Sequence, residues 1–231
     1  MKKKVLAITA LLFSAVVLAP SASGAAACVG GTYDAYIAGG GITCQIGSLV
    51  FSNFAFATSA GVPATAIPAT GVSVAIINLG AEFGFQFGTG MSVAGGFQDI
   101  IISFVVTGNI TDLHASFNGS FSGTGTSSDT ETFCKNGTSL PPLANCAVAN
   151  QGQYNLTNPP QNLAPPPLIF NPALTSIAIS KDINVSAGNN GTATISQVTD
   201  TFSVPEPMTL SMMGIGLLGL GLMRRRQMGK K

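Results

Sequence analysis

The segment SIAISKDINVS (residues 176–186) contains the pattern that decides the fold. Its positions alternate between two sets along the chain: Ile177, Ile179, Lys181, Ile183 and Val185 on one side, and Ala178, Ser180, Asp182 and Asn184 on the other. Successive side chains of a β-strand point to opposite faces of the sheet, so a period of two residues indicates a strand. The segment therefore predicts a β-strand with one largely aliphatic face.

The same alternation recurs upstream. FSNFAFA (51–57) places Phe54 and Phe56 on one face, and AEFGFQFG (81–88) does the same with Phe83, Phe85 and Phe87. Runs of Gly, Asn, Ser and Pro separate such segments, and no middle segment carries a sustained helical apolar stripe. Asn-Gly pairs, which suit type I′ hairpins, occur at 118–119, 136–137 and 190–191. We therefore expect roughly eight or more strands in an all-β domain, an antiparallel β-sandwich over residues 28–204.

The N-terminus has the features of an export signal. Lysines at positions 2–4 precede an apolar stretch over residues 5–18, and the small residues SASGAAA follow. We predict a signal peptide over residues 1–27, cut at its end or a few residues earlier. A lipoprotein acylated at Cys28 is the alternative, although Ala25 occupies the position where such signals carry a larger aliphatic residue.

All four cysteines lie in the segment that would be exported, where disulfides are the expected state. Of the three connectivities that four cysteines allow, we expect the nearest-neighbour one, Cys28 with Cys44 and Cys134 with Cys146. In the chain-entropy model, a closed loop of about 15 residues contributes roughly 3 kcal/mol. The second pair would staple a long loop over residues 134–171. No C-x-x-C spacing occurs and the chain has one histidine, so we expect no metal site and no cofactor.

The charge distribution argues against a nucleic-acid partner. Eight of the ten basic residues lie at the two chain ends. Between residues 28 and 204 the only charged side chains are Lys135 and Lys181 against Asp34, Glu82, Asp99, Asp112, Asp129, Glu131, Asp182 and Asp200. Phosphate recognition needs clustered cations, and this segment has none.

Some of these acids are candidates for chemistry. A glycosidase needs two carboxylates about 5–10 Å apart, and the candidates are Glu82, Asp99, Asp112 and Glu131. Asp129 with Glu131 is a lone acidic pair, without the repeated acids of a calcium loop. His114 has no G-x-S-x-G serine to activate. We therefore interpret the acids as solvated loop charges and His114 as structural, and we expect no enzymatic activity.

The C-terminus combines three features in order. They are the VPEP motif (Val204, Pro205, Glu206, Pro207), an uncharged run (208–223) and an arginine cluster (Arg224, Arg225, Arg226). As a helix, the uncharged run would span about 24 Å, less than the roughly 30 Å of a bilayer's hydrocarbon core. We predict a single short transmembrane helix over 208–223, with the arginines held in the cytoplasm as a stop-transfer signal by the positive-inside bias.

These residues, 204–226, resemble the PEP-CTERM sorting signal of Gram-negative bacteria. The resemblance implies export through the translocon, then recognition and processing by a membrane-embedded exosortase. It implies an inner-membrane precursor and a mature protein at the cell surface or in the extracellular biofilm matrix, with extracellular polysaccharide as a further partner. More loosely, C…Y..Y…C.IG…FSNF.F (28–56) and KDINV (181–185) are similar to a recurrent PEP-CTERM ectodomain, a likeness that brings no known activity or site.

Two functions fit these observations. The first is a non-enzymatic, exported surface or matrix protein whose domain has a structural or adhesive role. The alternative is a secreted domain that binds or cleaves polysaccharide. A cleft with two facing carboxylates and exposed aromatic side chains would favour the alternative, whereas a closed core with dispersed acids would favour the first.

Overall fold

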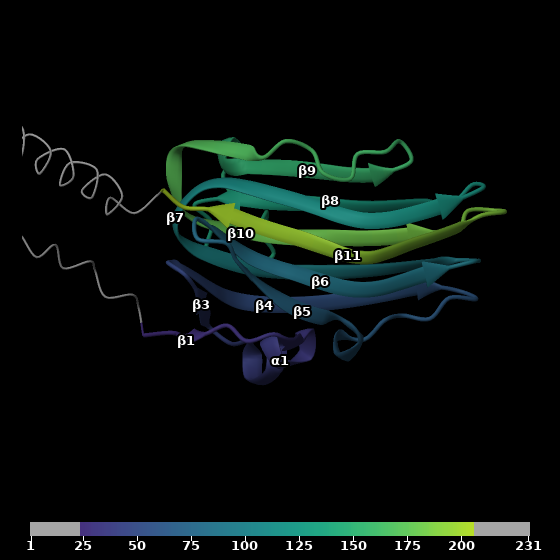
Figure 1. Ribbon diagram of the computed structural model, residues 1–231, viewed down its shortest axis with the longest axis horizontal. Coiled ribbons are helices and arrows are strands. Elements are labelled where there is room, and N and C mark those ends of the chain that lie inside the picture. The colour runs from purple at the N-terminus through teal and green to yellow at the C-terminus, as the bar shows by residue number, and fades with distance from the viewer. Residues whose placement is uncertain (1–23, 206–231) are drawn as a thin grey trace, which may run out of the picture.

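The computed structural model describes residues 24–205, which form an all-β domain, as the alternating pattern predicts (Figure 1). The strands are β1 (Ala26–Ala27), β2 (Gly31–Thr32), β3 (Cys44–Ile46), β4 (Leu49–Gly61), β5 (Ser73–Asn78), β6 (Glu82–Val93), β7 (Phe97–Ser122), β8 (Thr126–Lys135), β9 (Gln151–Asn158), β10 (Leu168–Ser186) and β11 (Thr192–Ser203). The helical elements are α1 (Tyr33–Ile37) and the short 3₁₀ turns η1 (Ala38–Gly40), η2 (Ala69–Gly71) and η3 (Val148–Asn150). The three alternating segments of the sequence lie in β4, β6 and β10.

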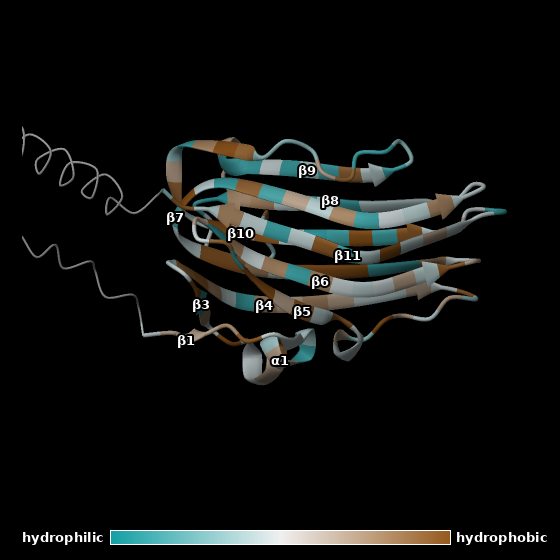
Figure 2. Ribbon diagram, in the orientation of Figure 1, coloured by the Kyte–Doolittle hydropathy of each residue, from teal (hydrophilic) through white to brown (hydrophobic). Residues whose placement is uncertain are grey.

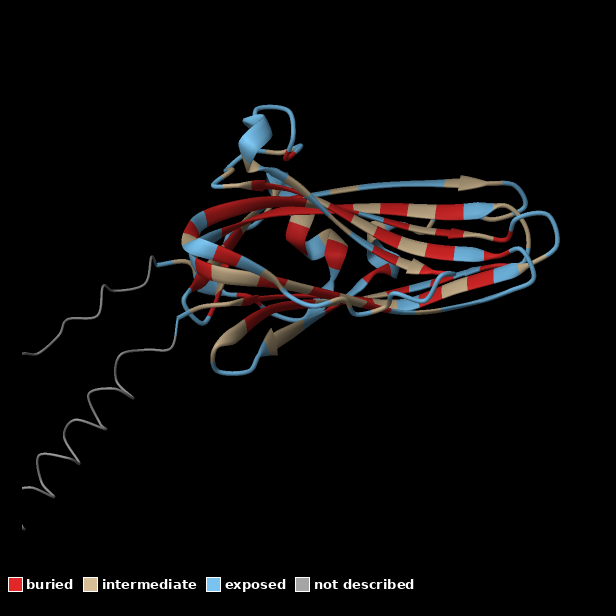
Figure 3. Ribbon diagram, turned by 90° about the horizontal axis from the view of Figure 1, so that it is seen from above, coloured by how far each residue is buried: buried red, intermediate tan, exposed pale blue. Residues whose placement is uncertain are grey.

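The long strand β7 determines how the sheet curls. All eleven strands belong to one hydrogen-bonded sheet. Residues 97–107 of β7 lie between β4 and β10, whereas residues 112–122 pair with β11. Gly108 lies between these halves with a φ of 149°, a conformation that residues with a Cβ rarely adopt. One strand therefore belongs to both layers, and the two sheets of the expected sandwich are a single sheet curled onto itself (Figure 3).

The N-terminal segment closes one side of the curled sheet. β3 pairs with β4 at one edge, and β2 pairs with β5 at the other. Between β2 and β3, α1 places the buried side chains of Tyr33 and Tyr36 in the core. The predicted disulfide Cys28–Cys44 is present and joins the two ends of this crossing segment. It therefore holds in place the part of the chain that spans both edges.

A proline-rich loop over residues 159–167 closes the other side. Its Asn162 exchanges two backbone hydrogen bonds with Thr157 of β9. The backbone N–H of Phe117 in β7 donates to the carbonyl of Leu163 at 3.0 Å. The loop thus connects β9 to the second half of β7, and the interior is covered on both sides.

Two local expectations need correction. Residues 134–171, expected as one long loop, contain β9 and the first residues of β10, although the predicted disulfide Cys134–Cys146 is present within them. The Asn-Gly pair at 118–119 lies inside β7 and not at a turn. A Cβ on Gly119 would lie 2.8 Å from the carbonyl oxygen of Thr194, so this glycine permits close approach of β7 and β11.

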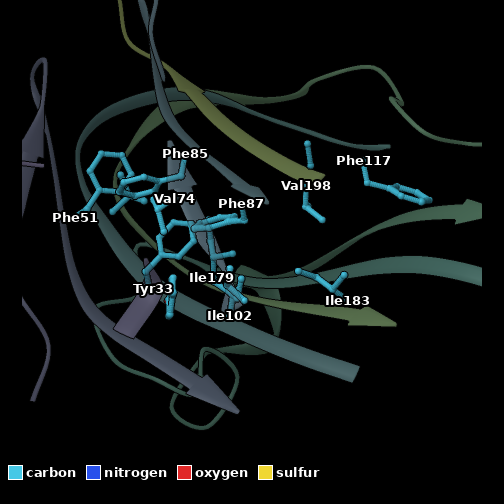
Figure 4. Packing of buried hydrophobic residues seen from close by; sticks show 14 of the residues in the cluster. Tyr33, Phe51, Val74, Phe85, Phe87, Ile102, Phe117, Ile179, Ile183 and Val198 are labelled. Atoms are coloured by element: carbon cyan, nitrogen blue, oxygen red, sulfur yellow. The ribbon is translucent and has the colours of Figure 1, made fainter. Parts of the chain in front are cut away.

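Phenylalanines from both layers form the centre of the core. The ring centroids of Phe51 in β4 and Phe85 in β6 are 4.7 Å apart, and Phe104 in β7 meets Phe202 of β11 edge-on. Figure 4 shows Phe51 and Phe85 within this core, and Figure 2 shows apolar and polar residues alternating along the strands that supply it. Each fully buried phenylalanine stabilises the fold by roughly 1.5–3 kcal/mol.

Residues 1–23 and 206–231 lie outside the described residues. The cleaved part of the signal peptide, the transmembrane helix 208–223 and the arginine cluster therefore remain predictions. No helix within residues 24–205 has the length and apolarity to cross a membrane. The two ends of the described chain leave the domain at the same end of the molecule (Figure 1).

Candidate functional site

The acids proposed as catalytic candidates do not converge. Glu82 and Asp112 border the end of β11. Asp99 is half-buried on β7, and Glu131 lies in the interior on β8. A glycosidase needs two facing carboxylates in one cleft, and these acids occupy three separate places.

Glu82 and Asp112 instead hold the end of the last strand. The hydroxyl of Thr201 donates to Oε1 of Glu82 at 3.1 Å, and the backbone N–H of Ser203 donates to Oδ1 of Asp112 at 3.0 Å. Nδ1 of His114 lies 3.7 Å from Oε1 of Glu82, and both side chains are partly exposed. These contacts fix β11 where the chain leaves the domain.

The interior contains four charged side chains, which we call the buried charge cluster: Asp129 and Glu131 of β8, Lys181 of β10 and Asp200 of β11. None of the four side chains has exposed surface. Nζ of Lys181 lies 2.9 Å from Oδ2 of Asp129, 2.9 Å from Oε2 of Glu131 and 2.6 Å from Oδ1 of Asp200. The amine is therefore the centre of the cluster.

Strand period and register bring these residues together. Lys181 is in phase with the buried Ile183, so it faces the core. Antiparallel pairing of β8 with β10 sets Glu131 opposite Lys181 and Asp129 opposite Ile183, which places both acids on the same face. Asp200 reaches the amine from β11, which does not pair with β10.

Sequence reasoning missed this cluster. It counted Lys181 and Asp200 only as charges, and it interpreted Asp129 and Glu131 as solvated loop residues, which is wrong because both are buried in a strand. The available signal was the phase of Lys181, which shares its face with isoleucines. Nothing in the sequence showed which acids would meet it.

The cluster has three carboxyl groups for one amine, so some carboxyl groups retain their protons. Burial raises the pKa of Asp129 to about 6, although Lys181 opposes this. Burial and then the neighbouring Glu131 raise the pKa of Asp200 well above its ordinary value. Burial alone would lower the pKa of Lys181, but the three carboxyl groups outweigh it and hold that pKa above the usual value. The raised pKa of Asp200 favours the protonated form of its carboxyl group.

Each acid of the cluster also has oxygens without a hydrogen-bond partner: both Oδ1 and Oδ2 of Asp129, Oε1 of Glu131 and Oδ2 of Asp200. Unpaired polar atoms in an interior are costly. Within residues 24–205, no group of three or more His, Cys, Asp or Glu side chains is arranged to hold a metal ion. The amine of Lys181 takes the place that a cation would need between Asp129 and Glu131.

A second pair of acids, Asp99 and Asp182, lies on the outer side of β7 and β10. Burial and then the neighbouring Asp99 raise the pKa of Asp182 to about 6. The hydroxyl of Ser59 donates to Oδ2 of Asp99 at 3.4 Å. A nearby carboxyl group raises the pKa of Asp182 because two adjacent negative charges repel each other.

A groove lies where β8 ends and β9 and β10 begin. Three neighbouring cavities of about 260, 250 and 340 Å³ share the side chain of Lys135 in their walls. Amide side chains, among them Asn150 and Gln153, share the rest of the lining with apolar residues, and Ile169 is 68% exposed beside them. No Asp or Glu lines any of the three cavities. The groove offers hydrogen-bonding groups without acid–base chemistry.

The predicted sorting motif begins where the last strand ends. β11 finishes at Ser203, and the backbone N–H of Val204 donates to the carbonyl of Ala81 at 3.0 Å. Pro205 is the last described residue, and Glu206, Pro207 and the arginines lie outside the described residues. The family model described as the PEP-CTERM protein-sorting motif matches residues 203–226. The chain carries a PEP-CTERM sorting motif.

Outside this motif, the likenesses found for the chain are distant. No curated protein sequence matches it. Among solved structures, the carbohydrate-binding module TmCBM61 in complex with β-1,4-galactotriose is similar at 10% identity and a TM-score of 0.29, covering 63% of this chain and 86% of the module. The enzymatically active domain of bacteriophage CBA120 tailspike protein 4 gives 13% identity and a TM-score of 0.22, covering 63% of this chain and 19% of the tailspike chain. Likenesses this weak carry no argument about function.

Proposed function

We propose that this PEP-CTERM protein is a cell-surface or extracellular-matrix component whose β-domain has a structural or adhesive role and no catalytic one. The sorting motif marks an exported protein that is sorted through its C-terminus. The proposed route runs through the export translocon to an inner-membrane precursor, which an exosortase-type enzyme then processes for delivery to the surface.

The observation that carries this proposal is the junction between the domain and the motif. β11 ends at Ser203, and the motif match begins at the same residue. No spacer separates the folded domain from the sorting signal, so the whole domain is the cargo. The closed core and the dispersed candidate acids further support a non-catalytic role.

The test is surface exposure in a host that carries an exosortase. Antibody against the β-domain should label intact cells or the surrounding matrix. Deletion of the host exosortase should leave the full chain in the inner-membrane fraction and remove the surface label. Equal surface labelling with and without the exosortase would contradict the proposed route.

The groove beside Lys135 favours one second function, binding of an extracellular polysaccharide. Amide side chains and an exposed aliphatic residue suit neutral sugars, which present both hydroxyl groups and apolar ring faces. Binding is favoured over cleavage because no carboxyl group lines the groove. A glycan array with the released protein tests this function.

The array needs matched variants. Asn150→Ala and Gln153→Ala should each weaken any glycan signal by about tenfold, as the loss of a well-formed hydrogen bond does. Asn78→Ala on β5 removes an exposed amide remote from the groove and should change nothing. A glycan signal that all three variants retain would exclude the groove as the binding site.

A further inference from the structure

The buried charge cluster brings together an amine and a carboxyl group whose side chains have no exposed surface. We propose that Lys181 and Asp200 form an intramolecular isopeptide bond after the domain folds, with Glu131 as the group that transfers the protons. Oδ1 of Asp200 lies 2.6 Å from Nζ of Lys181, and Glu131 accepts a hydrogen bond from the same nitrogen at 2.9 Å.

The reaction balances without any added reactant. The proposed step starts from the ammonium form of Lys181, the acid form of Asp200 and the carboxylate form of Glu131. Nζ gives one proton to Glu131, and the free amine attacks Cγ of Asp200 to form the C–N bond. Glu131 returns that proton to the departing hydroxyl, the C–O bond breaks and water leaves. The nitrogen then loses its second proton to Glu131, which ends as a neutral acid beside the new amide.

Three features of the cluster favour this step. Holding the two groups in contact replaces a collision between separate molecules, an advantage equivalent to a very high effective concentration. All four side chains are fully buried, so the water that leaves has little tendency to return and hydrolyse the amide. The product also replaces a buried ammonium and a buried carboxylate with neutral groups, and buried charges are expensive to keep.

Asp200 is the acid that the geometry selects. It is the nearest of the three to Nζ, at 2.6 Å, and burial raises its pKa, which favours the acid form that can lose hydroxyl. Asp129 lies 2.9 Å from Nζ, but its oxygen makes no hydrogen bond with it. Tyr154 of β9 is the further titratable group near Glu131, and its hydroxyl donates away from the cluster to the carbonyl of Pro165 at 2.9 Å. Glu131 is therefore the proton acceptor that contacts the amine.

The bond would link β10 to β11, two strands that do not pair with each other. β11 leads directly into the sorting motif, so any pull on the C-terminal tail acts first on this strand. A covalent link between Lys181 and Asp200 would prevent β11 from being peeled away from the domain. This inference does not depend on the proposed function.

Mass spectrometry of the mature protein purified from its host, with both chain ends determined, tests the bond. We expect an intact mass lower than that of the disulfide-bonded chain by one water. After denaturation and reduction, trypsin should cut after Lys135 but not after Lys181, because an acylated lysine is not a trypsin site. A second protease that cuts between residues 182 and 199 should yield two peptides joined through their side chains. An unmodified mass together with complete cleavage after Lys181 would overturn the proposal.

Two variants separate the roles of the neighbouring acids. Glu131→Gln keeps the shape of the side chain but cannot take the proton, so we expect the rate of bond formation to fall by about a hundredfold or more. Asp129→Asn should still form the bond. Bond formation at the normal rate in Glu131→Gln would exclude Glu131 from the reaction. The wild-type mass measurement decides whether the bond exists even if a variant fails to fold.

Discussion

Lys181 is placed on the apolar face of its strand although burial of an unpaired ammonium costs several kcal/mol. Three carboxyl groups surround its amine, and this is more than neutralisation requires. Replacement of such a group by well-packed apolar residues is often neutral or stabilising. The presence of all four charged residues in one interior site therefore points to a role that simple packing would not supply, and an isopeptide bond is such a role.

The raised pKa of Asp129 predicts how stability depends on pH. Its carboxyl group has a pKa of about 6 in the fold, against an ordinary value of 3.8. A group with a raised pKa stabilises the fold fully below its unfolded pKa, and this contribution is lost as the pH rises through the folded pKa. A difference of this size corresponds to roughly 3 kcal/mol. The free energy of unfolding should therefore fall between about pH 4 and about pH 7.

Urea denaturation at several pH values measures this dependence. Asp129→Asn should show a smaller fall over the same pH range, because the amide does not titrate. An identical pH profile in the variant and the wild type would contradict the assignment to Asp129.

Gly84 of β6 provides a second test at a single residue. A Cβ at this position would overlap the backbone carbonyl of Asp200 on β11. Gly84→Ala should therefore force β6 and β11 apart and lower the free energy of unfolding by about 2–3 kcal/mol. Gly31→Ala is the control, since a Cβ there meets no atom within 4 Å, and it should change stability by less than about 0.5 kcal/mol. Thermal unfolding of both variants compares them, and equal melting temperatures would refute the close approach.

At the scale of elements, the strands could be predicted but their spatial order could not. The alternation of apolar and polar residues in β4, β6 and β10 is a local pattern, so it can be recognised within one segment of the sequence. The curl of the sheet depends on β7, whose two halves pair with different strands. Which strands meet depends on long-range pairing, and a single sequence contains no direct record of it. The Asn-Gly pair at 118–119 was predicted as a hairpin turn for the same reason, because the long-range pairing that places it inside β7 is not visible in the sequence.

The two disulfides should differ in their effect on stability. Chain entropy alone gives loops of 16 and 12 residues nearly the same contribution, about 2–4 kcal/mol each. Cys28–Cys44 also holds the segment that spans both sheet edges and carries the buried Tyr33 and Tyr36. Replacing Cys28 and Cys44 with serine should therefore destabilise the protein more than replacing Cys134 and Cys146. Urea denaturation of the two double variants measures the difference, and the reverse order would contradict the role of the first disulfide in closure.

At the scale of the whole molecule, the sorting signal was readable from sequence and the buried charge cluster was not. The motif is contiguous, so its order and composition are visible in one short stretch. The cluster draws its residues from β8, β10 and β11, and only the folded chain places them around one nitrogen. The sorting signal is therefore contiguous in the sequence, whereas the residues of the buried charge cluster come together only in the folded chain.

We propose that the C-terminal tail divides three functions among three short segments: recognition, membrane retention and stop of transfer. Prolines lack a backbone N–H and keep the preceding residue out of a helix, so Pro205, Glu206 and Pro207 should form an extended strip next to the membrane. The run over 208–223 is short for a span, and a permanent anchor would be held more firmly by a longer helix. The arginine cluster should stop transfer. This order is suited to a precursor that is held briefly and then cut.

Replacement of Pro205, Glu206 and Pro207 with alanine should therefore leave the full-length precursor in the inner membrane, because the processing enzyme loses its recognition strip while the span remains. Replacement of Arg224, Arg225 and Arg226 with glutamine should act differently: it should weaken retention before processing, through loss of the positive-inside bias. Cell fractionation with antibody against the β-domain distinguishes the two results. Mass spectrometry of the wild-type protein at the cell surface should find the tail removed, and a surface protein that still carries residues 224–231 would show that the tail is a plain membrane anchor.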